Sequence, residues 1–333
     1  MKYRIAATTF CLLVVLGCTR ATQSERAIPA TGEARQGEAP AEEVKPLTSL
    51  EPVVEAGNDF GFRLFRELHG RAPDKNLFIS PTSVSMALAM TWNGAEGETR
   101  RQMAEALGLG TAQPGNMSMG VSGLLGLLQE ADPKVTLEVA NAIWARQGIP
   151  LAEKFIKTSR EYYQAEVGAL DFTSPDAVRT INQWVSDRTR GKIETLFDRL
   201  EADDVVVLAN AVYFKGTWTE EFDKQKTWDQ DFRKGDGTAR RHPMMRQGGE
   251  YRYWKGDDLE LISLPYGAGR FEMLVLLPAS GAPVIGKSPT GEPGFDEIPR
   301  SPGEALDRLV GQMTPENLER WLAAMTMRDG NIV

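Results

Sequence analysis

The stretch Val205–Trp218 reads VVVLANAVYFKGTW and decides the fold. From Val205 to Phe214 every residue except Asn210 is apolar, and β-branched and aromatic types dominate. This composition predicts a long strand that is buried on both faces of a sheet. A buried amide needs hydrogen-bond partners, because leaving it unpaired costs about 1–3 kcal/mol. Asn210 is therefore expected to be a structural pin or part of a conformational switch.

This strand resembles the central sheet strand of the serpins, in which an apolar run leads into Asn-Ala, an aromatic residue, Phe-Lys-Gly, a Trp and a later Phe, here Phe222. Further segments resemble serpin elements in serpin order: Asn76–Val84, Gly94–Thr99, Asn141–Trp144, Ile181–Ile193, Leu264–Tyr266 and Met273–Pro278. Together the matches cover residues 55–333. The resemblance implies an α+β, serpin-like fold that is incomplete at its C-terminus. In that fold a helical N-terminal half packs on a large mixed β-sheet, and smaller sheets lie beside it.

The resemblance also implies roles for individual residues. Ser80 and Ser83 match the "shutter" beneath the large sheet, where they would join a hydrogen-bond cluster with Asn210. Trp218 matches the "breach", where insertion of a further strand begins. Small polar residues in an apolar helix more often bond back to their own helix, so a purely local role for the two serines stays open.

Local patterns predict several helices and strands. Ser80-Pro81 and Thr314-Pro315 each give a helix an N-cap followed by proline. Val135–Ala145 alternates like a strand, and Gly267–Gly269 is typical of a hairpin turn. Val121–Gln129 predicts a short helix without Lys or Arg. The comparable helix is basic in serpins that glycosaminoglycans activate, so no heparin-type activator is expected.

The N-terminus has the features of an export signal. Residues 1–18 place two cations before an apolar run and end at Cys18, in a context that resembles a bacterial lipobox. This predicts an exported outer-membrane or cell-surface lipoprotein, lipidated at Cys18 and attached to the membrane by that anchor. A plain secretory signal and a secreted protein are the alternative. Residues 19–52, rich in Pro and Glu, predict a disordered tether before a partial serpin domain at 53–333, which contains a Gly/Pro-rich insertion at 279–303.

Composition narrows the function. A net charge of −8 over 333 residues argues against nucleic acid as a partner. Cys11 and Cys18 are the only cysteines, so the mature body has no disulfide or thiolate site. His69 and His242 are the only histidines, and no hydrolase, zinc-protease or nucleotide motif is present. A cation at a helix end accounts for His69, and His242 is expected to be exposed. We expect neither an enzyme nor a cofactor.

The chain ends at Met325–Val333, where the resemblance places the approach to the next strand of the large sheet. The reactive-centre loop of a serpin lies beyond this point. The resemblance implies a serine-type endopeptidase inhibitor that acts by suicide-substrate loop insertion, inactive without that loop. Its partner would be a serine or cysteine protease once the missing segment is supplied. A non-inhibitory cell-surface binding or structural module on the same scaffold is the alternative.

Overall fold

The computed structural model describes residues 50–201, 204–278, 285–287, 293–295 and 302–332. Helices and strands are both abundant, which confirms the α+β class. In chain order the elements are α1 (Glu51–Arg71), α2 (Pro81–Trp92), α3 (Gly97–Ala106), α4 (Pro114–Glu130), β1 (Val135–Arg146), α5 (Glu153–Tyr163), β2 (Glu166–Leu170), α6 (Pro175–Arg188), β3 (Val206–Gly216), η1 (Lys224–Lys226), β4 (Trp228–Arg233), β5 (Ala239–Met244), β6 (Gln247–Lys255), β7 (Leu259–Tyr266), β8 (Phe271–Pro278), β9 (Ile285–Lys287), β10 (Pro293–Phe295), α7 (Pro302–Gln312), α8 (Pro315–Ala324) and β11 (Thr326–Ile332).

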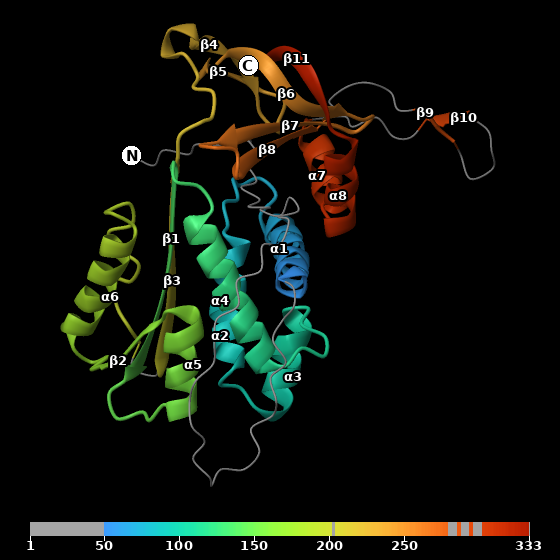
Figure 1. Cartoon of the computed structure of the whole chain (residues 1–333). Coiled ribbons are helices and arrows are strands. Elements are labelled where there is room, and N and C mark those ends of the chain that lie inside the picture. The colour runs from blue at the N-terminus through green and yellow to red at the C-terminus, as the bar shows by residue number, and fades with distance from the viewer. Residues whose placement is uncertain (1–49, 202–203, 279–284, 288–292, 296–301, 333) are drawn as a thin grey trace, which may run out of the picture.

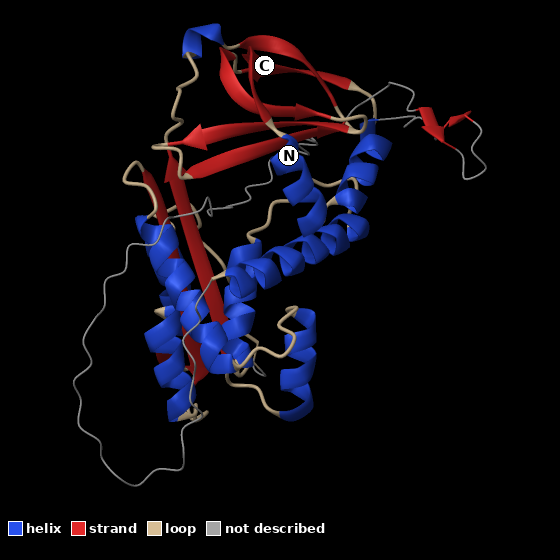
Figure 2. Cartoon of the chain, turned by 45° about the vertical axis from the view of Figure 1, so that its right-hand side comes forward, coloured by secondary structure: helices blue, strands red, loops and turns tan. Residues whose placement is uncertain are grey.

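A three-stranded sheet of order β2-β1-β3 runs through the lower half of the molecule (Figures 1 and 2). β1 and β3 are antiparallel over their whole length, from Val135 opposite Gly216 to Ala145 opposite Val206. β2 pairs in parallel with the C-terminal end of β1 only. Among the described residues, β3 therefore has a strand on one side and a free edge on the other.

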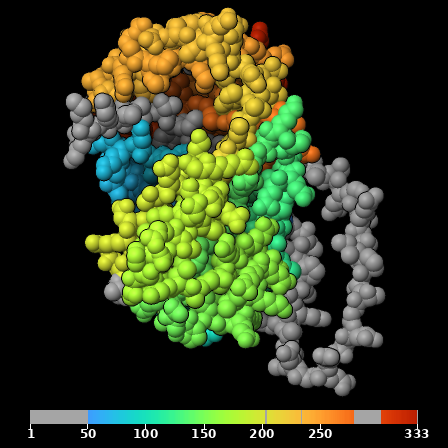
Figure 3. Space-filling model, turned by 90° about the vertical axis from the view of Figure 1, so that its left-hand side faces the viewer, coloured from blue at the N-terminus to red at the C-terminus, as the bar shows by residue number. Residues whose placement is uncertain are grey.

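Helices cover this sheet on both faces. α6 lies on one face, visible in yellow-green at the front of the lower half in Figure 3, and α2, α4 and α5 lie on the other (Figure 1). The α6 face buries alternate residues of β3, Val207, Ala209 and Ala211, together with Trp144 and Ile181. The opposite face joins β1 to the core of the helical half. The alternation of strand side chains thus divides the sheet between two hydrophobic cores.

The prediction that Val205–Phe214 is buried on both faces is wrong for its first half. Val206 and Leu208 each keep 37% of their surface exposed. They lie on the face opposite α6, at the free edge, where the described helices do not cover the strand. The apolar run therefore includes side chains that no described helix or strand covers.

A four-stranded antiparallel sheet of order β11-β6-β7-β8 lies above the first sheet (Figure 1). Its inner face packs on α7 and α8 through Leu261, Leu274 and Trp321. β11 pairs with β6, so Thr326–Ile332 belongs to this sheet and does not approach the three-stranded one. This corrects the expectation for the end of the chain. The alternation of polar and apolar residues in Thr326–Ile332 is too weak to choose a sheet.

Three further boundaries differ from the prediction. α1 begins at Glu51, so Glu51 and Pro52 are helical rather than part of the tether. α4 begins at Pro114, not Val121, because a proline at its first position outweighs four glycines that lower its helix propensity. The region 279–303 contains the short strands β9 and β10, and α7 begins in it at Pro302. The N-caps at Ser80 and Thr314 are confirmed.

Candidate functional site

The candidate site lies where α2 packs against β3. Ser80 caps α2, and its Oγ lies 2.7 Å from Oγ of Ser83. The backbone N–H of Ser83 also donates to Oγ of Ser80, at 3.4 Å. The two serines are thus brought together as predicted. Their recorded bonds are local to the start of α2, and none reaches Asn210.

Asn210 bonds to the neighbouring strand instead. Its Nδ2 donates to Oδ1 of Asn141 at 2.8 Å, and the two residues face each other in the β1–β3 register. Nδ2 of Asn141 in turn donates to the backbone carbonyl of Tyr163 at 2.8 Å. Asn141 is 2% exposed. Two linked amide side chains therefore connect β3 through β1 to the end of α5.

This connection continues into the helices through the Tyr163 side chain. Nδ2 of Asn93 donates to the Tyr163 hydroxyl at 2.9 Å, and Oγ of Ser118 lies 3.3 Å from it. Ser118 also donates to Oδ1 of Asn93 at 3.1 Å. Burial raises the pKa of Tyr163, although these two hydrogen bonds oppose the rise. The hydroxyl is therefore neutral and links α2, α4 and α5 as a fixed polar contact.

One acceptor at the sheet end of this connection has no donor. Oδ1 of Asn210 is buried and has no hydrogen-bond partner among the described residues. Buried polar atoms in native proteins are nearly always paired, and an unpaired one calls for an explanation. This acceptor lies on the strand whose outer edge is free and next to the exposed Leu208. The unpaired acceptor therefore lies on the strand whose other edge is free among the described residues.

Trp218 joins the end of β3 to the upper sheet. Its ring stacks on Tyr266 with centroids 4.2 Å apart, and Phe222 meets it edge-on at 5.9 Å. Backbone bonds reinforce the contact: Thr219 N donates to Pro265 O at 2.9 Å, and Gly267 N donates to Thr217 O at 2.8 Å. The predicted breach residue thus lies in a well-connected joint between the two sheets.

Asp132 completes this joint and was not predicted. It precedes β1, is 3% exposed, and accepts from the backbone N–H of Lys134 at 2.9 Å and of Ala268 at 2.7 Å. Arg270 N is a third, longer donor at 3.4 Å. Burial disfavours the charged carboxylate, but the three backbone donors outweigh it and lower the pKa of Asp132. The partners lie up to 138 residues away, so no local pattern could reveal them.

The remaining predicted residues play no part here. His69 is buried in the last turn of α1, at a helix end as predicted, and its Nε2 lies 2.7 Å from Oδ1 of Asp307. His242 is exposed, as expected. Cys18 lies outside the described residues. Within the described ranges no cluster of His, Cys, Asp and Glu is placed to hold a metal ion, and no helix has the length and apolarity to cross a membrane.

Comparison with known proteins supports the same architecture. A family model described as "Serpin (serine protease inhibitor)" matches residues 55–288. The corticosteroid-binding globulin of Oryctolagus cuniculus is 34% identical over 281 residues, 83% of this chain and 67% of the relative. A serpin-like protein of Thermococcus kodakarensis is 36% identical over 232 residues, 69% of this chain and 54% of the relative. The plasma serine protease inhibitor of Bos taurus is 32% identical over 245 residues, 72% of this chain and 60% of the relative.

Solved structures agree. Human thyroxine-binding globulin with a cleaved reactive loop has a TM-score of 0.74 at 25% identity, covering 85% of this chain and 78% of that one. Emu ovalbumin has a TM-score of 0.73 at 24% identity, covering 84% and 72%. The serpin-like fold is confirmed. The chain spans about two thirds of the first curated relative and little more than half of the second.

Proposed function

Since the chain belongs to the serpin family, we propose that it forms the strand-receiving part of a serine-type endopeptidase inhibitor. The observation that carries this proposal is the free edge of β3 together with the unpaired acceptor of Asn210. A free edge exposes unpaired backbone groups and is a template for a further strand. Val206 and Leu208 add apolar surface at the same place.

In the proposed mechanism, a protease cleaves an exposed loop supplied by a longer form of the protein and stays covalently attached to it. The freed loop then enters beside β3 as a new strand, and the displacement distorts the enzyme. Insertion begins near Trp218, whose contacts with Tyr266 hold that end of β3 in place. Oδ1 of Asn210 gains a donor when the new strand arrives. Ser80 and Ser83 support the strand from below, as the shutter does in the family.

This proposal predicts that residues 1–333 alone inhibit no protease. The test starts from the longest reading frame that contains them, expressed and mixed with a panel of serine and cysteine proteases. We expect an SDS-resistant adduct with at least one protease. Asn210→Leu should shift the outcome from adduct to released, cleaved product, because the inserted strand loses a buried hydrogen bond. Absence of any adduct across the panel contradicts the proposal.

A second function, a non-inhibitory binding module, is favoured by a separate observation. Several relatives are named corticosteroid-binding globulin, and the matched human structure is a thyroxine-binding globulin. A scaffold of this family can therefore serve as a carrier. An extended protein that forms no adduct with any protease, and whose sequence after Val333 contains no run of small residues before an exposed loop, would support this alternative.

The proposal includes the location of the protein. We infer export, directed by residues 1–18, and attachment of the chain to an outer membrane or cell surface through lipidated Cys18. Mass spectrometry of the mature N-terminus tests this: a diacylglycerol-modified Cys18 supports the anchor. A free terminus cleaved elsewhere supports secretion instead. The helix α4 has no Lys or Arg, which argues against a heparin-type activator.

A further inference from the structure

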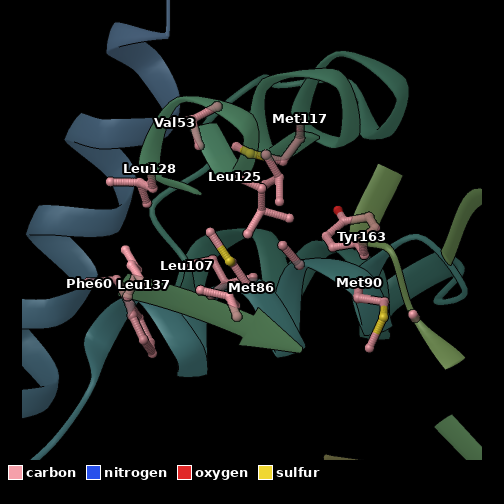
Figure 4. Packing of buried hydrophobic residues seen from close by; sticks show 14 of the residues in the cluster. Val53, Phe60, Met86, Met90, Leu107, Met117, Leu125, Leu128, Leu137 and Tyr163 are labelled. Atoms are coloured by element: carbon pink, nitrogen blue, oxygen red, sulfur yellow. The ribbon is translucent and has the colours of Figure 1, made fainter. Parts of the chain in front are cut away.

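A cavity of about 100 Å³ lies in the helical half of the molecule, between α1, α2 and α4. It is separate from the free edge of β3 and from the joint around Trp218. Figure 4 shows side chains from different elements, among them Val53, Leu107, Met117 and Leu128, gathered around this interior. An apolar cavity of about 150 Å³ stays dry and binds benzene or xenon, so the space here suits a molecule of that order.

The lining has a polar side and an apolar side. Asn58 on α1 and Thr82 and Ser85 on α2 bring polar groups to the α1–α2 side, whereas the residues from α4 are apolar. Oγ of Ser85 donates to the carbonyl of Thr82 at 3.1 Å, which leaves the hydroxyl oxygen able to accept. No charged residue lines the cavity. A charged ligand would lose its hydration without gaining a partner.

Gly57 leaves room for a side chain on the α1 side of the cavity. It lines the cavity from α1, and a Cβ built on it would meet no atom within 4 Å. Two methionines, Met86 and Met117, form part of the opposite wall. Their flexible side chains can adapt to a ring slightly larger than the empty volume.

We propose that this cavity is a binding site for a small uncharged molecule with an apolar ring or short chain and a single hydroxyl group. The ring packs against the leucines and methionines of the α4 side. The hydroxyl lies on the α1–α2 side, where it donates to Ser85 or accepts from the Asn58 amide. Neither the family nor the strand-receiving edge requires this site.

Phenol, benzene and benzoate test the parts of this proposal: phenol has a ring and a hydroxyl group, benzene lacks the hydroxyl, and benzoate is charged. The full chain, labelled with ¹³C at its methionine methyl groups, is titrated with each compound and followed by NMR. We expect phenol to shift the Met86 and Met117 signals saturably, while exposed Met245 stays unchanged. Benzene should bind at least fivefold more weakly and benzoate not at all. Equal binding of all three compounds, or shifts that never saturate, overturns the proposal.

Two glycine substitutions give a matched pair. Gly57→Leu fills the cavity and should weaken phenol binding more than tenfold. Gly126→Leu places the same side chain on α4, where a Cβ also meets open space but outside the cavity, and should change binding less than twofold. Phenol binding that survives in Gly57→Leu contradicts the site. If Gly57→Leu does not fold, Val121→Phe narrows the same space from α4 and replaces it.

The double variant Asn58→Leu/Ser85→Ala tests the orientation of the ligand. Without the amide and the Ser85 hydroxyl, phenol should lose its advantage over benzene, so that the two affinities come within twofold. Retention of the fivefold preference would place the hydroxyl elsewhere and overturn the assigned polar side.

Discussion

Asp132 is a buried residue next to the three-stranded sheet, and Asn210 is a half-buried residue of that sheet with a buried side-chain oxygen, but the surroundings of the two differ. Both oxygens of Asp132 accept backbone N–H groups, and the residue ties the start of β1 to the β7–β8 hairpin. Asn210 has a partner for its nitrogen and none for its oxygen. A fully paired polar group fixes one arrangement, whereas a half-paired one leaves an alternative available. Under the proposed function, Asp132 forms a permanent joint, whereas Asn210 marks a position that changes when a further strand enters.

Asp132→Ala should have the largest effect, because it breaks the joint. It removes a buried carboxylate and with it two charge-assisted hydrogen bonds, from the N–H groups of Lys134 and Ala268, which is expected to cost about 2–4 kcal/mol of unfolding free energy. Urea unfolding measures the change. Asp171→Ala is the control, because Asp171 makes similar bonds to Thr173 on the exposed surface, and its effect should be much smaller. Similar losses in both variants would contradict the assigned joint.

The same carboxylate predicts a pH dependence. The pKa of Asp132 is lowered in the folded state, so its contribution to stability is full above the ordinary value of 3.8 and is lost as the pH falls through the folded-state pKa. The wild type should therefore lose more stability than Asp132→Asn between about pH 5 and pH 2. Parallel pH profiles for the two proteins would show that the carboxylate is not held in its charged form.

Asn141→Ala should have the second largest effect. Asn141 is the buried link between Tyr163 and Asn210, and its removal leaves the Tyr163 carbonyl and the Asn210 amide without partners. We expect a loss of about 2–3 kcal/mol. Tyr163→Phe, which keeps the backbone carbonyl but removes the hydroxyl, should cost less. If the two variants lose the same unfolding free energy, the hydrogen bonds of Asn141 contribute no more to stability than the Tyr163 hydroxyl.

Gly267→Ala probes how tightly the joint is built. Gly267 has a φ of +55°, and an added Cβ would lie 2.6 Å from Oδ1 of Asp132. Gly97 has the same φ of +55° with open space around its Cβ position, so Gly97→Ala reports the backbone strain alone. We expect Gly267→Ala to cost about 1–2 kcal/mol more than Gly97→Ala, because the clash adds to a strain common to both. Equal costs, measured by urea unfolding, would show that the hairpin moves freely relative to Asp132.

The sequence points to Asn210 more clearly than to Asp132. Asn210 stands out because it interrupts a continuous apolar strand, and the same Asn-Ala pair recurs at Asn141, which the register places opposite. Asp132 gives no such signal, since the two partners that make it a joint, Ala268 N–H and Arg270 N–H, belong to a hairpin that is remote in sequence. Periodicity identified β1, β3, β7 and β8, because each has an apolar face to bury. It could not show that Val206 and Leu208 are exposed, because burial depends on what lies beyond the strand's free edge.

Asn210→Ala should have the smallest effect, and that result would sharpen the comparison most. The substitution removes the hydrogen bond to Asn141 and leaves the buried Oδ1 of Asn141 without a donor, but it also removes the unpaired Oδ1 of Asn210. One unpaired acceptor replaces another, so the net cost should stay near the value of a single hydrogen bond, about 1 kcal/mol. Asn182 is the matched control: its Oδ1 accepts from Leu196 and Phe197, and its Nδ2 donates to the Phe197 carbonyl. Asn182→Ala should therefore cost more, as read from urea midpoints with equal slopes. If Asn210→Ala instead costs as much unfolding free energy as Asn182→Ala, then Oδ1 of Asn210 already has a donor. That result would contradict the proposal that β3 accepts a further strand.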